Sequence, residues 1–369
     1  MRCGIEFEYL LIDAHGPTRG RVRDFGNLPY PDIAALLDIR PGEDDPALAT
    51  GDLGIKRGYW YLEGDERFHD DGRFATLAVK GVEIRTPPAD GAAAALAQLA
   101  VLERQLAAEL AGHGLALAVA GFHPMRGQYT FTPPLNAWEH ALRARCRAYD
   151  GSQVSTLSYG PDINLSHPGW SAERALAAAR RLHAAAPYIV PFSFSSPFLA
   201  GLPWGGLSWR TLQRAPLRPA VKLYLNEGAG EALACGLCHP PRLASEHGRI
   251  EFKAFDALLS PALLGACCTL LIGLCLADGP RLSGETPDTD AYQRAAQYGF
   301  ADPDIRQGAQ RWLALAEAAL RRHGQSVAAL APLHALLASG RTPAHSLLDA
   351  YARDGQLYQA GGLFTPAGR

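Results

Sequence analysis

Two glutamates near the start of the chain, Glu6 and Glu8, are separated by a single residue. Ile5, Phe7 and Tyr9 alternate with them, which is the period-two pattern of a β-strand with one apolar and one polar face. Both carboxylates therefore lie on the same face, about 6.6 Å apart along the strand. This spacing lets a divalent cation, or a pair of them, share the carboxylates as hard oxygen ligands. A single Glu-x-Glu pattern is also compatible with an ordinary strand face that is exposed to solvent and binds no cation.

The same alternation of polar and apolar residues recurs in three later segments, Val82–Thr86, Gly160–Ser166 and Arg249–Asp256. Because the pattern recurs, a shared polar surface is favoured over four unrelated solvated strands. The polar positions of the three segments are Glu83, Arg85, Asp162, Asn164, Ser166, Arg249, Glu251 and Lys253.

Long helical patterns lie between these segments, so the strands are expected to form an antiparallel sheet. Helices would cover its apolar face, and its other face would be an open polar cleft. Converging glutamates repel one another unless cations lie among them. Arginine and lysine beside them suit phosphate oxygens. Divalent metals with basic groups are what holds a nucleoside triphosphate during phosphoryl transfer.

At this point the sequence resembles a known family. Five segments are similar, in order and content, to the motifs of the glutamate-cysteine ligase family, including the carboxylate-amine ligases of its second group. The resemblance spans residues 4–256, and the C-terminal third matches only as a helical region. The segments are Gly4–Glu8, Val82–Pro87, Gly160–Ser166, Ser195–Phe198 and Ile250–Asp256.

The resemblance implies an α+β fold like the catalytic domains of glutamine synthetase and guanidino kinases, with a curved antiparallel sheet, helices on one face and an open polar active-site cleft on the other. It implies ATP and Mg²⁺ or Mn²⁺ as cofactors. The implied metal ligands are Glu6, Glu8, Glu83, Asp162 and Glu251, and the implied catalytic residues are Glu8, Arg85, Arg249 and Lys253.

Two of these positions depart from the family pattern. Asp162 stands where many members have a metal-binding histidine, and aspartate is still a good magnesium ligand. Lys253 stands where an arginine is usual, and lysine loses the two-pronged grip of a guanidinium. These departures leave the identity of the bound acid or phosphate contact open.

Nucleotide contacts are expected from Arg210, Arg214, Asn164 and Lys253. Arg210, Arg214 and Arg218 are spaced by four residues, which aligns them on a helix, although Pro216 interrupts the last turn. Such a row is either a solvated helix face or a clamp for phosphate or carboxylate groups.

The sequence therefore predicts an ATP-dependent ligase that joins a carboxylate, in the first place the side-chain carboxylate of glutamate, to cysteine or another amine through an acyl phosphate. Two alternatives stay open: a phosphotransferase of the guanidino-kinase type, and a catalytically silent protein that binds a nucleotide or metabolite. The expected partners are small-molecule acid and amine substrates, and a homo-oligomer is left open.

The composition predicts a globular protein without affinity for polyanions. Of the 369 residues 48% are apolar and 20% charged, with 35 basic against 37 acidic side chains. We therefore expect one catalytic domain over residues 1–369 and neither a nucleic-acid nor a membrane partner. The acidic strand begins at residue 4 and leaves no room for a secretory signal, so a cytoplasmic location is expected.

Three further features carry expectations. The seven cysteines favour buried reduced thiols, and Cys235-Gly-Leu-Cys238 lacks the second Cys/His pair of a zinc site. Residues 257–277 are almost uncharged, but Ser260-Pro261 predicts the start of a buried helix too short to span a membrane. Residues 91–112 predict an amphipathic helix with Glu103 on its solvated face.

Overall fold

The computed structural model describes residues 1–46, 55–145, 152–226, 236–278 and 288–366. In this part of the chain the main sheet follows the order β11-β10-β12-β7-β1-β4-β3, and every pair is antiparallel except β10 with β11. The strands are β1 (Arg2–Asp13), β3 (Trp60–Phe68), β4 (Phe74–Arg85), β7 (Asp162–Ser166), β10 (Val221–Tyr224), β11 (Cys238–His239) and β12 (Ile250–Phe252).

The strand β1 lies at the centre of the sheet and is long enough to pair with different partners at its two ends. Its first half lies between β4 and β7, and its last four residues pair with β6 (Leu115–Val119). Short strands extend this arrangement: β2 (Val22–Arg23) and β5 (Ala89–Asp90) pair with β1, and β13 (Gln359–Ala360) pairs with β6. A separate hairpin joins β8 (Phe198–Leu199) and β9 (Leu202–Pro203).

The predicted alternation of β1 is confirmed. Ile5, Phe7 and Tyr9 are completely buried, while Glu6 and Glu8 are half-buried on the opposite face. The apolar positions of the three later strand segments are buried in the same way: Val82, Ile84, Ile163, Leu165, Ile250 and Phe252.

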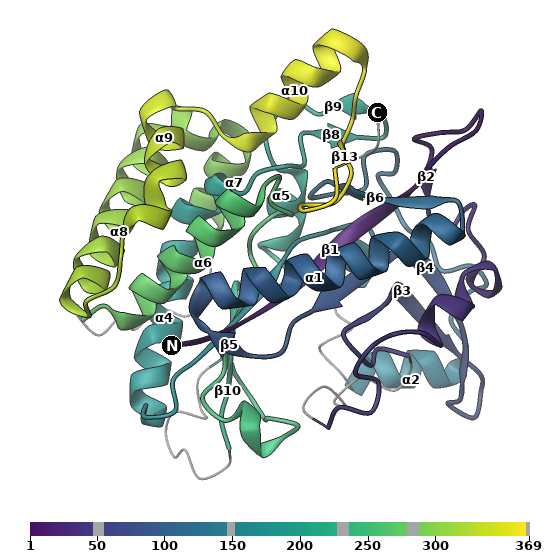
Figure 1. Cartoon of the computed structure of the whole chain (residues 1–369), viewed down its shortest axis with the longest axis horizontal. Coiled ribbons are helices and arrows are strands. Elements are labelled where there is room, and N and C mark those ends of the chain that lie inside the picture. Colours follow the sequence, from purple (N-terminus) through teal and green to yellow (C-terminus); the bar gives the residue numbers. More distant parts are fainter. Residues whose placement is uncertain (47–54, 146–151, 227–235, 279–287, 367–369) are drawn as a thin grey trace.

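Helices cover the apolar face of the sheet (Figure 1). The helices α1 (Gly91–Gly112) and α4 (Ala172–Ile189) pack on the strands, and α6 (Pro261–Leu276) packs against both of them and against α8 (Pro303–Arg322). This is the α+β arrangement that the sequence predicts. The other helices are α2 (Ala137–Arg145), α3 (Ser152–Ser155), α5 (Trp209–Arg214), α7 (Thr289–Tyr298), α9 (Ala331–Ser339) and α10 (Pro343–Asp354).

The helix α6 is the buried helix that the sequence predicts. The Ser260 hydroxyl accepts a hydrogen bond from the Leu263 amide at 3.2 Å and caps the first turn, and Pro261 occupies the first helical position. At the other end, Arg174 and Arg181 of α4 donate to carbonyl oxygens of the last turn. No helix among the described residues is long and apolar enough to cross a membrane.

The cysteines agree with the expectation of buried thiols where the structure describes them. Cys3, Cys267, Cys268 and Cys275 are free and buried, and Cys238 is free and half-buried. Cys146 and Cys235 lie outside the described residues, and so does half of the Cys-x-x-Cys motif.

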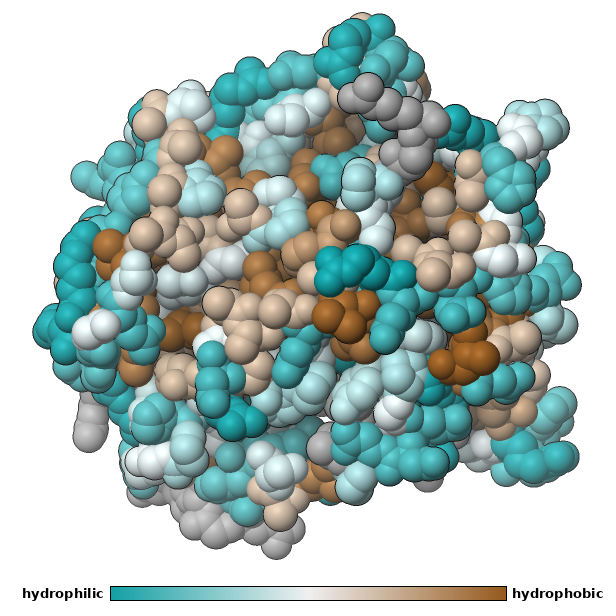
Figure 2. All heavy atoms as spheres, in the orientation of Figure 1, coloured by the Kyte–Doolittle hydropathy of each residue, from teal (hydrophilic) through white to brown (hydrophobic). Residues whose placement is uncertain are grey.

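The outer surface of α1 is rich in alanine, and its exposed positions include Ala93, Ala94 and Ala97. Figure 2 accordingly shows weakly hydrophobic side chains across the middle of this face, where α1 and α6 lie in Figure 1, and hydrophilic side chains around them. Helix formation there rests on alanine's high propensity and on the leucines of the inner face.

The prediction that Glu103 lies on a solvated face of α1 is wrong. Its carboxylate is completely buried and accepts hydrogen bonds from the Tyr9 hydroxyl at 2.5 Å and from the Thr365 hydroxyl at 2.7 Å. It also accepts from the backbone amides of Leu363, Phe364 and Thr365. The C-terminal loop supplies donors that no helical periodicity reveals, and Glu103 thereby joins this loop to β1 and α1.

We predict that Glu103→Ala lowers the free energy of unfolding by about 3 kcal/mol, because buried amide and hydroxyl donors lose a charged acceptor. Urea unfolding followed by circular dichroism measures the change. The matched control is Glu109→Ala, an exposed glutamate of the same helix, which is expected to change stability by no more than about 0.5 kcal/mol. Equal effects of the two substitutions would contradict the anchoring role of Glu103.

Candidate functional site

A cleft of about 770 Å³ lies on the polar face of the sheet. All of the site residues that the sequence predicts line it, although they come from four strands, one helix and the loop residues on either side of β12. They are Glu6, Glu8, Glu83, Arg85, Asp162, Asn164, Arg210, Arg214, Arg249, Glu251 and Lys253.

Strand register brings the carboxylates of the cleft together. Glu6 lies opposite Asp162 on one side of β1 and Arg85 on the other, whereas Glu8 lies opposite Glu83. On the next strand pair, Glu251 lies opposite Asn164. Directly opposed residues in antiparallel strands have neighbouring side chains, so the acidic residues gather in two groups, one on each side of β1.

The first group, which we call the Glu251 cluster, consists of Glu6, Asp162 and Glu251. One carboxylate oxygen of each residue lies within 4.8 Å of the others. The Lys253 ammonium contacts Asp162 Oδ2 and lies 2.7 Å from Glu251 Oε1. Burial alone would raise the pKa of the Glu251 carboxyl, but Lys253, Lys222 and Arg249 outweigh it and hold that pKa well below its usual value. Glu251 is therefore ionised and strongly paired.

The second group, which we call the Glu83 cluster, consists of Glu8, Glu63 and Glu83, again with oxygens within 4.8 Å of one another. Lys80 lies 2.5 Å from Glu8 Oε1, and Lys56 lies 2.8 Å from Glu63 Oε2. Among the described residues, none donates a hydrogen bond to Glu83, although this side chain is only 6% exposed. Burial, and then the charges of Glu63, Glu6 and Glu8, raise the pKa of Glu83 well above its usual value.

The Glu83 cluster fits a divalent cation. Three carboxylates offer the hard oxygen ligands that Mg²⁺ and Mn²⁺ prefer. In the part of the chain that the structure describes, the buried carboxylate of Glu83 has no hydrogen-bond donor, which such a group normally has. A dication beside Glu83 would relieve both the desolvation and the mutual repulsion of the cluster.

A backbone contact fixes Glu8 within this cluster. The Gly160 amide donates to Glu8 Oε2 at 2.9 Å. A Cβ at residue 160 would lie 2.2 Å from the Phe255 carbonyl oxygen, so only glycine permits this close approach. The glycine that begins the motif at residues 160–166 thus has a structural reason.

Two arginines of the cleft, Arg85 and Arg249, are held in place by several partners, and Arg249 forms an ion pair with Glu246 Oε1 at 2.7 Å. Arg85 Nε donates to the Gly58 carbonyl oxygen at 2.7 Å. Arg249 donates to Asn164 Oδ1 at 2.5 Å, and its guanidinium lies 3.9 Å from the centre of the Tyr224 ring. Stacking on the Tyr224 ring, the hydrogen bond to Asn164 and the ion pair with Glu246 together orient the Arg249 guanidinium in the cleft.

The helix α5 contributes Arg210 and Arg214, which are only 4% and 7% exposed. Arg210 donates to the carbonyl oxygens of Ala254 and Lys253, and Arg214 donates to that of Pro219. Burial, and then the neighbouring charges of Arg210 and Arg218, lower the pKa of Arg214 to about 9. The predicted alignment of Arg218 with them fails because α5 ends at Arg214.

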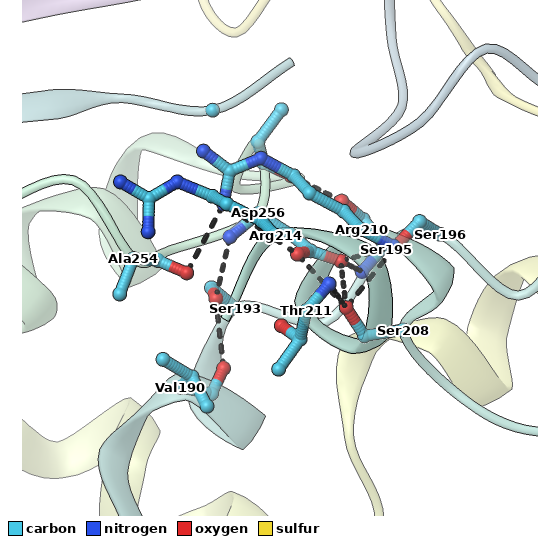
Figure 3. A network of polar contacts seen from close by, with 12 residues as sticks. Val190, Ser193, Ser195, Ser196, Ser208, Arg210, Thr211, Arg214, Ala254 and Asp256 are labelled. Carbon is cyan, nitrogen blue, oxygen red and sulfur yellow. Dashed lines mark hydrogen bonds and ion pairs between the residues drawn. The ribbon is translucent and has the colours of Figure 1, made fainter. Parts of the chain in front are cut away.

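A buried polar network orients α5, as Figure 3 shows. Asp256 is completely buried and accepts hydrogen bonds from the Ser195 amide and from the hydroxyls of Ser196 and Ser208. Ser208 in turn caps α5 by accepting from the Thr211 amide at 3.0 Å. The motif at residues 195–198 therefore serves the cleft indirectly, by fixing the helix that carries Arg210 and Arg214.

Sequence reasoning missed Glu63, Lys56, Lys80 and Lys222, all of which line the cleft. The alternation of Tyr61 and Glu63 with Leu62 was available as a signal, but a β-bulge after Glu63 ends it. Lys222 faces Glu251 from the next strand, and this pairing is visible only once the strand order is known.

In fold, the chain is similar to two solved structures. It matches a bifunctional glutathione synthetase from Pasteurella multocida with a TM-score of 0.60, 13% identity and coverage of 96% of this chain and 51% of that chain. It matches a glutamate–cysteine ligase from Francisella tularensis with a TM-score of 0.55, 11% identity and coverage of 96% and 85%. These likenesses confirm the predicted fold class.

In sequence, the model for glutamate-cysteine ligase family 2 matches residues 2–212, more than half of the chain, and the chain belongs to this family. A glutamate–cysteine ligase, EgtA, of Mycolicibacterium smegmatis is 30% identical over 66% of this chain. A glutamate–cysteine ligase of Halobacterium salinarum is 28% identical over 71% of it. The matched region spans 51% of the first relative and 66% of the second.

We predict that Glu83→Gln raises the melting temperature by a few degrees at pH 8 in the presence of a chelator. The pKa of Glu83 in the folded protein lies above its usual value of 4.5, so the folded state retains a proton that the unfolded state has lost. The Glu83 carboxyl therefore lowers the stability of the parent as the pH rises from about 4.5 through the folded pKa, and the variant lacks this contribution.

Differential scanning calorimetry at pH 5 and pH 8 measures the difference, which is expected to be larger at pH 8. Glu109→Gln on the exposed side of α1 is the control. A Glu83→Gln variant less stable than the parent at pH 8 would mean that the carboxylate has a stabilising partner.

Proposed function

We propose that the protein is an ATP-dependent carboxylate-amine ligase. The observation that carries the proposal is the convergence of two carboxylate clusters and several buried cationic side chains in one cleft of a chain from glutamate-cysteine ligase family 2. Metal ligands beside phosphate-binding groups are the equipment of phosphoryl transfer. We further infer that residues 1–369 act as one catalytic unit, because the helical C-terminal region packs on the helices that cover the sheet.

The residues of the cleft divide into metal-binding and anion-binding roles in this proposal. Glu8, Glu63 and Glu83 hold one Mg²⁺. Glu6, Asp162 and Glu251 are ligands that a second Mg²⁺ reaches only by displacing Lys253. When bound, Mg²⁺ would neutralise charge on the phosphate oxygens of ATP. Nucleotide contacts are assigned to Arg210, Arg214, Asn164 and Lys253.

The proposed reaction has two steps. An oxygen of the acid's carboxylate attacks the γ-phosphorus of ATP, the bond from that phosphorus to the bridging oxygen breaks, and ADP leaves. The amine nitrogen then bonds to the acyl carbon of the resulting acyl phosphate, inorganic phosphate leaves with the carbon–oxygen bond electrons, and the amine loses a proton. Arg85, Arg249 and Lys253 stabilise the oxygens of the transferred group in both steps.

We propose glutamate, activated at its side-chain carboxylate, as the acid and cysteine or another amine as its partner. The support is family membership and the names of the two relatives, both glutamate–cysteine ligases. The resemblance to the family implies an arginine at position 253, and the Lys253 ammonium found there gives no bidentate contact, so the amine is proposed as cysteine or another amine.

We predict that the purified protein releases ADP and inorganic phosphate when it is given ATP, Mg²⁺, glutamate and a suitable amine, and that an amide forms in equal amount. Glu251→Gln is expected to fold and to reduce turnover by a factor on the order of 10², because a group that orders the transition-state charges is lost. Coupled ADP release and mass spectrometry of the product measure both quantities.

Glu109→Gln, on the exposed face of α1, is the control and is expected to keep the parental rate. Glu103→Gln is unsuitable for this purpose because Glu103 is buried. A phosphorylated acceptor in place of an amide would identify a phosphotransferase, and the lack of nucleotide turnover across a broad panel of acids and amines would refute the ligase.

A further inference from the structure

The two carboxylate clusters of the cleft differ in how the protein balances their charge. In the Glu251 cluster, the Lys253 ammonium contacts Asp162 and also lies 2.7 Å from Glu251 Oε1, so it joins two of the three carboxylates. The third, Glu6, accepts a hydrogen bond from Asn164 Nδ2 at 3.0 Å. Every carboxylate of this cluster therefore has a donor from the protein.

The lysines beside the Glu83 cluster are bound differently. An ammonium group has three donors, and Lys80 uses them on Glu8 and on the carbonyl oxygens of Ser155 and Ser158. It therefore sits against the loop at residues 155–158 and lies 4.0 Å from Glu63. Lys56 pairs with Glu63 alone among the carboxylates of the cluster. Glu83 receives no hydrogen bond from any described residue, so this cluster keeps an open position for a cation.

The Lys253 ammonium and a divalent cation compete for the same oxygens. A metal ion requires direct contact with carboxylate oxygens at roughly 2.0–2.6 Å. At Asp162 and Glu251 those oxygens already face a positive charge whose side chain is only 15% exposed. Two cations at one such position repel each other strongly, because burial reduces screening by solvent.

We propose that Lys253 is the resident cation of the Glu251 cluster in the free protein. The free chain then binds one divalent cation, at the Glu83 cluster, and its Glu251 cluster accepts a second only when the Lys253 ammonium is removed. Asp162 and Lys253 contact each other directly and form one ion-paired unit.

Titration with Mn²⁺ in the absence of nucleotide and substrates tests this inference. The electron paramagnetic resonance signal of free Mn²⁺ gives the number bound per chain, and Mn²⁺ shares the preference of Mg²⁺ for oxygen ligands. We expect one bound Mn²⁺ for the parent and none for Glu83→Gln. For Lys253→Met we expect two, the second at least tenfold tighter than any second binding to the parent.

The matched control is Lys56→Met, which removes a lysine from the edge of the Glu83 cluster and is expected to keep the count at one. A second readout is the melting temperature, which added Mn²⁺ should raise more in Lys253→Met than in the parent, because two sites are then linked to folding. Lys253→Gln, which keeps a polar group without the charge, replaces Lys253→Met if the latter does not fold.

Any of four results would overturn the inference: two tight sites or none in the parent, an unchanged count in a folded Lys253 variant, or a retained site in Glu83→Gln. The parent measurement is decisive even if no Lys253 variant folds. Since no nucleotide is present, a negative ligase assay leaves this result untouched. Conversely, two Mn²⁺ sites in a protein with ligase activity would refute the inference that Lys253 is the resident cation but would leave the proposed ligase function standing.

Discussion

The whole site depends on the alternation of side chains along one strand, β1. Its apolar residues are completely buried under the helices, which fixes the direction of Glu6 and Glu8 toward the opposite face. The two glutamates then lie beside carboxylates of different neighbouring strands, Glu6 beside Asp162 of β7 and Glu8 beside Glu83 of β4. A shift of one residue in the register of β1 would place both carboxylates in the core and destroy both clusters.

This arrangement concentrates negative charge at a cost comparable to the burial of core residues. Two carboxylates about 5 Å apart repel each other by about 3 kcal/mol at the effective dielectric constant of a partly buried site, and complete burial of a side chain such as Phe7 contributes about 2–3 kcal/mol. The chain must therefore supply positive charge at the clusters. Lys253, Lys80 and Lys56 do so, and only Glu83 is left without a donor among the described residues.

The sequence predicted the part of the site that follows from local pattern. Period-two alternation located the polar residues of β1, β4, β7 and β12, and the structure brings all of those predicted as site residues into one cleft. The N-cap at Ser260 located α6 in the same local way. Each of these inferences needs only the geometry of a single strand or helix.

The residues that were missed or misjudged depend on contacts between distant segments. Lys80 lies on β4, yet its ammonium bonds to Glu8 and to carbonyl oxygens of residues 155 and 158. Glu103 looks solvated on a helical wheel, but the loop at residues 363–365 covers it with amide donors. A pattern within one element carries no information on which loop will later pack against it.

Tyr9 connects the strand that the sequence pattern predicted to the buried Glu103 that it misjudged. This contact explains how β1 tolerates its charged face. The Tyr9 ring lies in the core beside Phe7, and its hydroxyl donates to the buried Glu103 carboxylate, which also holds the C-terminal loop. The strand that carries Glu6 and Glu8 is thus anchored from its apolar side by a charge-assisted hydrogen bond, a stronger kind than a neutral one. Because β1 is held there, its movement does not relieve the repulsion on the polar side, and the lysines paired with the two clusters balance that repulsion instead.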